Sequence, residues 1–182
     1  MNKKKAFSEM IIHTPICTHS KASNILIIGS MDEYIQKELL KHKKESSFKF
    51  IELLDLEKID NKTIDIVVLT NMSLDLKSLI NIDRVLKNDA ILVFTSASFS
   101  QDREKLRNDL KLVGEKFWIV MPFRFNHTTC ILASKKYHPT ADLNLQRADF
   151  IEDLEYYSTD IHIASFVFPA NIHKELTGIA KR

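Results

Sequence analysis

The sequence predicts an α/β domain whose mostly parallel sheet carries helices on both faces and includes an antiparallel last strand. Three observations favour this fold class. Short apolar runs rich in β-branched residues alternate with segments whose apolar residues recur at helical spacing. The chain has 182 residues, of which 45% are hydrophobic and 27% charged, which suffices for one sizeable core. Finally, the last two apolar runs follow one another without a helix between them, which indicates a hairpin-like pair.

The first half of the chain contains three expected strands. Residues 24–29, Asn-Ile-Leu-Ile-Ile-Gly, form an almost wholly apolar run that is typical of a buried parallel strand. Asp32 can cap the helix that follows from residue 33 to about residue 44. Residues 48–54 and 64–70 are the next strands, and the second of these is again nearly continuous in its hydrophobicity.

The second half of the chain continues the alternation. A helix over 76–86 and an amphipathic helix over 101–113 are expected from their apolar spacing. The remaining strands are expected at 90–95, 117–121 and 128–134, the last two joined by a loop that contains Pro122, Arg124 and His127. This order is the outline of a Rossmann-like fold of the methyltransferase type. Because such sheets bind ligands at the carboxyl ends of their strands, residues 29–32, 54–55 and 70–73 mark the expected site.

We expect one domain over residues 1–182. Residues 1–22 lead into the sheet, 23–135 form the sheet core, and 136–182 form a helical tail rich in aromatic and acidic residues that packs back on the sheet. No internal repeat, low-complexity segment or flexible linker interrupts the chain.

The composition excludes several classes of partner. The 26 basic and 24 acidic residues leave a net charge of +2, so no global field attracts nucleic acid. The basic start, Lys3 to Lys5, is followed by polar residues rather than the apolar core of a signal peptide, and no run is apolar for the length of a membrane span. Two distant cysteines suit a reducing compartment. We therefore expect a cytoplasmic protein without a nucleic-acid or membrane partner.

The chain has only three glycines, Gly29, Gly114 and Gly178. Neither GxGxxG nor GxxxxGK[ST] can be written with glycines so far apart, which excludes the ordinary dinucleotide and triphosphate loops. A nucleotide-like ligand would therefore need an altered loop.

Several segments occur in an order shared with one enzyme family. Ser8–Pro15 is similar to a YHEMxxHxP motif, 24–29 to VLIIG, and Leu39–His42 to the end of REVLKH. The most specific is Tyr156–Pro169, which is close to YYNxxxHxAAFxLP, and two further pieces, Met121–Pro122 and Ile131–Lys136, match the last two strands. Together these segments resemble the spermidine synthases, the polyamine aminopropyltransferases, along nearly the whole chain.

The departures from that family are as informative as the matches. Family members begin with a small β-rich domain, whereas this sequence begins almost at the first motif, so we expect a shortened and divergent member without that domain. One strand stands between His42 and Ile64 where two are expected. The family's GGGDGG loop reads Gly-Ser-Met-Asp-Glu-Tyr over 29–34, and these side chains would crowd the backbone approach that glycines allow a cofactor.

The resemblance implies transfer of an aminopropyl group from decarboxylated S-adenosylmethionine to putrescine. The attacking amine must lose a proton, because an ammonium has no lone pair, and the family supplies two aspartates in a DSxDP motif. Here Thr70 and Ser73 stand at those positions, and neither hydroxyl can act as a base near neutral pH. We therefore assign no catalytic residue and expect ordinary activity to be weak or absent.

The remaining site residues are also implied by the resemblance. Gly29, Asp32 and Asp55 would bind the cofactor, and Asp32 and Tyr156 would contact the amine substrate. Asp32 has an alternative role as a helix N-cap, and Tyr156 as an aromatic of the core.

We expect no metal, because Glu9 and His13 lie at helical spacing but lack a third ligand, and we expect His162 to be structural. We also expect no permanently bound cofactor. Decarboxylated S-adenosylmethionine would be the co-substrate, and the ligand would be a polyamine or a nucleoside.

Two hypotheses from different classes follow. The protein is either a divergent aminopropyltransferase of polyamine metabolism, associating as a homodimer as family members do, or a non-catalytic binding or interaction protein that retains the fold.

Overall fold

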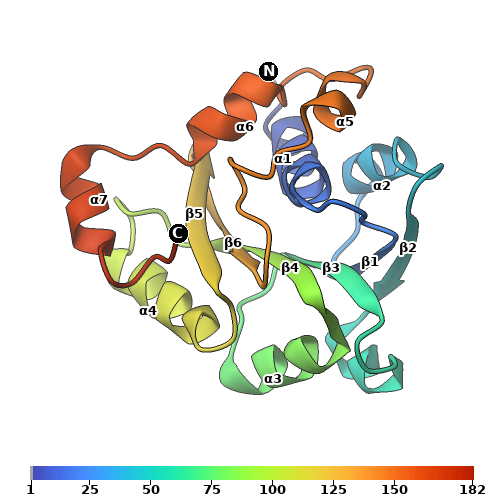
Figure 1. The fold of residues 1–182 in the computed structure, drawn as a ribbon, viewed down its shortest axis with the longest axis horizontal. Helices are drawn as coiled ribbons and strands as arrows, with labels where there is room; N and C mark the ends of the chain where they lie inside the picture. The colour runs from blue at the N-terminus through green and yellow to red at the C-terminus, as the bar shows by residue number, and fades with distance from the viewer. Residues whose placement is uncertain (1) are drawn as a thin grey trace.

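The computed structural model describes residues 2–182 and contains one six-stranded sheet with helices on both faces (Figure 1). The strand order is β2-β1-β3-β4-β6-β5. Strands β1 to β4 are mutually parallel, and β6 runs antiparallel to both β4 and β5. The predicted fold class, with its antiparallel last strand, is confirmed. The strands are β1 Asn24–Gly29, β2 Ser47–Ile51, β3 Ile64–Thr70, β4 Leu86–Ser96, β5 Ile119–Phe125 and β6 Thr128–Ser134.

Two layers of helices enclose the sheet. The helices are α1 Lys3–Thr18, α2 Glu33–Leu40, α3 Leu76–Val85, α4 Arg103–Gly114, α5 Leu145–Asp149, α6 Thr159–Ser165 and α7 Ala170–Leu176, with a 3-10 turn, η1, at Leu53–Lys58. Figure 1 shows α1, α2, α5 and α6 on one side of the sheet and α3 and α4 on the other. No helix within residues 2–182 is long and apolar enough to cross a membrane.

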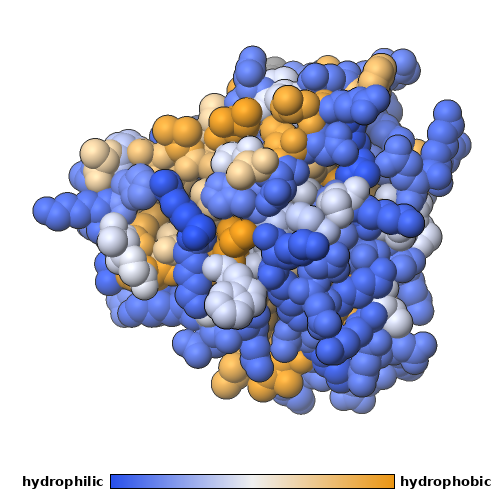
Figure 2. Space-filling model, in the orientation of Figure 1, coloured by the Kyte–Doolittle hydropathy of each residue, from blue (hydrophilic) through white to orange (hydrophobic). Residues whose placement is uncertain are grey.

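Alternation along each buried strand builds two separate cores. In β1, Ile25 and Ile27 face the core under α1 and α2, whereas Leu26 and Ile28 face the core over η1, α3 and α4. Both faces of the central strands are therefore covered, which explains why these strands read as continuous apolar runs rather than as alternating ones. Around this frame the surface is mostly hydrophilic, with an apolar band over α6 and the segment after it, where Ile163 and Val167 are exposed, and a smaller apolar patch over α3, where Leu76 and Ile80 are exposed (Figure 2).

Several boundaries differ from the predicted ones. Helix α2 ends at Leu40, and a run of turns continues to about residue 45. Strand β4 begins directly after α3, at Leu86. Strand β5 extends to Phe125, so Pro122 and Arg124 lie in the strand rather than in a loop. Proline is tolerated there because β5 is an edge strand, and its missing N–H costs no ladder hydrogen bond on the open side.

The predicted shortage of one strand between α2 and β3 is confirmed. Within the described chain, only β2 lies in that interval, and it forms one edge of the sheet. The chain then passes through η1, whose Leu56 packs with the α3 side chains, before β3 begins. The 29–32 loop therefore lies near the edge of the sheet.

Candidate functional site

The carboxyl ends of β1 and β3 are fastened to each other. The Thr70 hydroxyl is buried and shares its proton between the Ile28 and Ser30 carbonyl oxygens, the first at 3.3 Å. In return the Ser30 N–H donates to the Thr70 carbonyl at 3.4 Å. The Asn71 side-chain amide adds a 2.6 Å bond to the Ser30 hydroxyl. This part of the expected site is thus occupied by contacts between its own loops.

Gly29 is required by this close approach. Its φ is +115°, a conformation that L side chains rarely adopt, and a Cβ built there would overlap the Thr70 carbonyl oxygen. Packing against Thr70 therefore accounts for Gly29, and a cofactor contact at this glycine stays a prediction.

Asp32 has the capping role that was one of its two predicted alternatives. One carboxylate oxygen accepts the Ile35 N–H at 3.0 Å, which satisfies one of the free donors of α2. The side chain is exposed at the carboxyl edge, so a second role in ligand contact stays a prediction.

Asp55 lies in η1, beyond the carboxyl end of β2. Its carboxylate pairs with Lys58 at 2.6 Å, within the same turn. Hydrogen bonds connect η1 to α3, because the guanidinium of Arg84 in α3 donates to the carbonyls of Leu56 and Ile59 at 2.9 and 2.8 Å. The contacts of Asp55 are therefore local, and its role in cofactor binding is untested.

Tyr156 is half-buried beside the end of β5. Its ring lies 6.3 Å from that of Phe125, and it lines a cavity of about 250 Å³ together with Arg124 and Ser165. No residue of the 29–32 loop lines this cavity, whereas Met31 lines a separate apolar cavity of about 100 Å³ beside β2. The predicted amine pair of Asp32 and Tyr156 does not share one cavity here.

Glu9 holds the C-terminal segment. Its carboxylate is fully buried in α1 and accepts the N–H groups of Glu155, Tyr156 and Tyr157, the last two at 2.8 Å. Hydrogen bonds from several backbone N–H groups stabilise the negative charge of a buried carboxylate, and the carboxylate in turn gives those buried donors an acceptor. Glu9 therefore joins two segments about 150 positions apart in the chain, and each of these segments resembles a family motif.

His13 belongs to a buried polar chain between α1 and α2. Its Nε2 donates to the Glu38 carboxylate and its Nδ1 accepts from Nε2 of His42, both at 2.9 Å. The Lys41 ammonium pairs with the same carboxylate at 2.7 Å. Burial lowers the pKa of His13, and it lowers the pKa of His42 to about 3, so both imidazoles are neutral near pH 7.

His162 is structural, as expected. Its Nε2 donates to the Pro139 carbonyl at 2.9 Å, which leaves Nδ1 to accept the Tyr157 hydroxyl at 2.8 Å. Burial lowers the pKa of His162 to about 4. All the hydrogen-bonding capacity of this imidazole is therefore used inside the core.

Cys130 is not activated as a nucleophile. It is fully buried in β6, and burial raises the pKa of its thiol to about 12, so the reactive thiolate is absent near neutral pH. His127, by contrast, is exposed in the hairpin.

Sequence reasoning missed a charged cluster at the opposite edge of the sheet. Potential ligand atoms of His19, Asp65 and Asp89 lie within 4.8 Å of one another. The Lys87 ammonium, however, contacts Asp65 at 2.8 Å, and Nδ1 of His19 accepts the Lys21 N–H, which leaves the ring proton on Nε2. The lysine thus supplies the local positive charge, and Nε2 in this tautomer has no lone pair for a metal.

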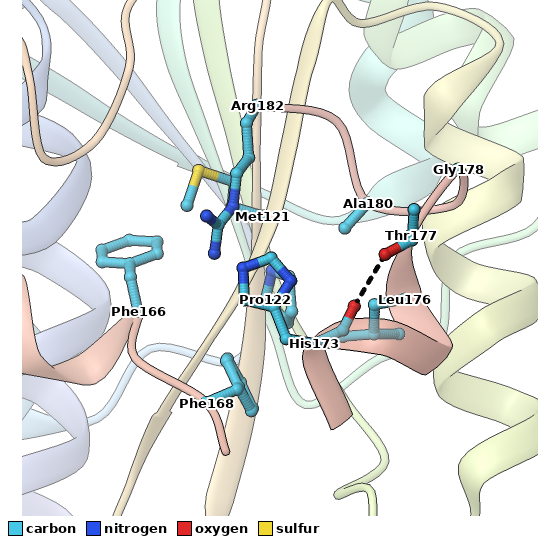
Figure 3. Close-up of a pocket in the computed structure, with 10 residues that line it drawn as sticks. All are labelled: Met121, Pro122, Phe166, Phe168, His173, Leu176, Thr177, Gly178, Ala180 and Arg182. Atoms are coloured by element: carbon cyan, nitrogen blue, oxygen red, sulfur yellow. Dashed lines mark hydrogen bonds between the residues drawn. The ribbon is translucent and has the colours of Figure 1, made fainter. Parts of the chain in front are cut away.

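Sequence reasoning also missed the cavities along β5. The apolar one has a volume of about 200 Å³, and Figure 3 shows Phe166 and Phe168 facing Arg182 and His173 across it. Its walls come from β5 and from two separate parts of the C-terminal segment, a convergence that no local pattern in the sequence reveals.

Comparison with known proteins supports the resemblance. A family model described as the spermine/spermidine synthase domain matches residues 4–77. The chain is 26% identical to the polyamine aminopropyltransferase of Helicobacter acinonychis over 93% of this chain and 76% of the relative. It is 23% identical to that of Clostridium beijerinckii, over 95% of this chain and 78% of the relative.

The fold agrees as well. A spermidine synthase from Thermotoga maritima superimposes with a TM-score of 0.82 at 18% identity, covering 97% of this chain and 75% of that one. A spermidine synthase in complex with the transition-state analogue AdoDATO gives the same score and identity, over 96% and 74%. The matched domain, the relatives along nearly the whole chain and the shared architecture agree, and the chain is similar to the spermidine synthase, or polyamine aminopropyltransferase, family in both sequence and fold.

Proposed function

We propose that this protein acts in polyamine metabolism as a spermidine synthase-like protein in which aminopropyl transfer is weak or lost. The observation that carries the proposal is the state of Thr70. Its hydroxyl stands where the resemblance implies the first aspartate of the family, and it is buried against the backbone of the 28–30 segment.

The chemistry of transfer supports this proposal. The attacking nitrogen must be deprotonated, and a threonine hydroxyl neither takes up a proton near pH 7 nor pairs with a cationic amine as a carboxylate does. Ser73 is exposed and likewise offers no carboxylate. The acids that follow β1 and β3, Asp32 and Asp75, both cap helices, Asp75 by accepting the Ser78 N–H at 2.7 Å.

Ligand binding belongs to the same proposal. A solved relative binds AdoDATO, and decarboxylated S-adenosylmethionine is the corresponding co-substrate here. Gly29, Asp32 and Asp55 would contact that molecule, and Asp32 and Tyr156 would contact a polyamine. We further propose that the protein is cytoplasmic and homodimeric. In this proposal residues 1–182 form a single domain, and no cofactor is permanently bound.

A non-catalytic binding or interaction role is the second candidate. The buried hydrogen bonds of Glu9, His13 and His162 support it, because these polar residues of the interior keep their partners while the expected reactive positions lack carboxylates. In this role the protein would bind a nucleoside or a polyamine without turning it over.

A transfer assay with decarboxylated S-adenosylmethionine and putrescine tests the main proposal. We expect product formation far below that of an active family member measured in parallel, and normal turnover would refute the proposal. Calorimetric titration with decarboxylated S-adenosylmethionine, 5'-methylthioadenosine and spermidine separates the two candidates. Saturable binding without turnover favours the binding role, whereas no binding of any of the three removes the enzyme hypothesis.

A further inference from the structure

A cavity of about 320 Å³ lies beside the end of β5, at the carboxyl edge of the sheet. Because β6 is antiparallel to both β4 and β5, the ends of β4 and β5 lie at the same edge as the ends of β1 and β3. Its walls come from the loop after β4, from the β5–β6 hairpin and from the segment around α7. The residues that matter most are Ser98, Ser100, Arg124, His127, Thr129 and Phe168.

The lining carries positive charge and no carboxylate. Two arginines and one histidine line the cavity, and none of the lining residues is Asp or Glu. Arg103 is already engaged, since its guanidinium pairs with Glu175 at 3.1 Å and lies over the Phe99 ring. The cavity therefore differs in charge from a site built for a cationic polyamine.

Arg124 is the lining cation that remains free. Among residues 2–182 it forms no salt bridge, and its guanidinium lies over the Phe168 ring, 5.2 Å from the ring centre. A guanidinium stacked by one face keeps its N–H edge for a planar or tetrahedral anion, which it can hold with two parallel bonds. Thr129 lies directly across from Arg124 on β6, and it also lines the cavity.

The location and size fit a ligand site. Open α/β sheets bind their ligands beyond the carboxyl ends of the strands, and small-molecule sites begin at about 300 Å³. Arg124 also lines the cavity of about 250 Å³ that contains Tyr156 and Ser165, so this residue borders two neighbouring cavities. The aromatic rings of Phe99 and Phe168 supply apolar wall beside the charge.

We propose that the cavity beside Arg124 binds a small organic anion, in which an aromatic or apolar body carries a carboxylate or a phosphate. The Arg124 guanidinium pairs with the anionic group, and the Ser98 and Ser100 hydroxyls donate to it. Phe168 and Phe99 pack against the body of the ligand. This site is independent of the proposed loss of aminopropyl transfer, because it involves a ligand of the opposite charge.

Isothermal titration with phenyl phosphate and benzoate tests the proposal, and benzylamine serves as the cation of matched shape. We expect saturable binding of at least one anion, weakened about tenfold or more in Arg124→Gln and less in Arg124→Lys. Added salt should weaken the binding further. Which anion binds more tightly distinguishes phosphate from carboxylate ligands.

Lys111→Gln is the matched control, because it removes the same charge from an exposed position on α4 outside the cavity. Its affinity should equal that of the unaltered protein, and circular dichroism should show that every variant is folded. Equal affinity in Arg124→Gln, binding of benzylamine as tight as that of the anions, or no binding of either anion overturns the proposal. These outcomes do not depend on the transfer assay, so failure of this site and failure of the proposed function are separable.

Discussion

The interface between α1 and the C-terminal segment differs sharply from the carboxyl edge of the sheet. At the interface, the buried Glu9 carboxylate accepts N–H groups of the C-terminal segment, and the His13 ring lies against that of Tyr157. Both ring nitrogens of His13 and of His162 are hydrogen-bonded inside the protein. At the edge, Asp32 is exposed and serves the first turn of its own helix, and Thr70 ties two loops together. The difference teaches that the polar residues within the two most family-like segments hold the scaffold together, and that resemblance there measures the fold rather than the chemistry.

The largest effect is expected for a substitution at Glu9, which disrupts the interface between α1 and the C-terminal segment. Glu9→Ala leaves buried N–H groups of residues 155–157 without an acceptor and creates a cavity, so we expect the free energy of unfolding to fall by about 3–5 kcal/mol. Urea denaturation measures the change. Glu155→Ala, which removes an exposed carboxylate paired with Lys5, is the control and should have little effect. Equal stabilities of the two variants would contradict a structural role for Glu9.

The next effect concerns the contact between β1 and β3. Gly29→Ala places a methyl group against the Thr70 carbonyl at a φ of +115°, and we expect a loss of about 2–4 kcal/mol in the free energy of unfolding. Gly178→Ala is the matched control, because Gly178 also has a positive φ but has nothing within 4 Å of the added carbon. It should lose about 1 kcal/mol from backbone strain alone. If both variants lose the same amount, the close approach at Thr70 contributes nothing.

The buried histidines predict that stability falls in acid. The pKa of His162 is lowered from 6.5 to about 4, so below pH 6.5 the unfolded chain takes up a proton that the folded chain refuses. Stability is therefore full above pH 6.5 and decreases toward pH 4, by about 1.4 kcal/mol per pH unit for each such histidine. His13 and His42 act in the same direction.

Denaturation of His162→Gln at several pH values measures the contribution of this one histidine to the pH dependence of stability. Glutamine can still donate to Pro139 and accept from Tyr157, so the variant should fold, and its stability should fall less steeply between pH 6 and 4.5 than that of the unaltered protein. Parallel pH profiles would mean that the pKa of His162 is the same in the folded and unfolded states.

The sequence-based predictions succeeded where the signal was local and periodic. Strands β1, β3 and β6 have the predicted limits, because a continuous apolar run bounded by polar residues indicates a strand that is buried on both faces. The end of β5 was predicted wrongly, because Pro122 is a turn signal in isolation and only the edge position of the strand makes it acceptable.

The site was harder to predict because its geometry joins distant segments. The identity of Thr70 indicated that a carboxylate was missing, but the hydroxyl's two acceptors across the β1–β3 gap depend on how the strands approach. The cavity at Arg124 combines walls near residues 98, 124 and 168, and Arg124 itself had been expected in a loop. Spacing along the chain carries no information about such convergence.

The smallest effect is expected for substitutions of Asp32, which test whether the carboxyl edge of the sheet has a role beyond capping α2. Asp32→Ala removes the N-cap of α2 and should lower the free energy of unfolding by about 1 kcal/mol, whereas Asp32→Asn keeps a capping oxygen and should be nearly neutral. Calorimetric titration of both variants with spermidine then separates the two roles of this residue. If Asp32 only caps the helix, any affinity for spermidine is the same in Asp32→Asn and in the unaltered protein. If Asp32→Asn loses that affinity while keeping its stability, the exposed carboxylate contacts the amine, and the carboxyl edge retains a functional charge that the hydrogen bonds of the loop do not reveal.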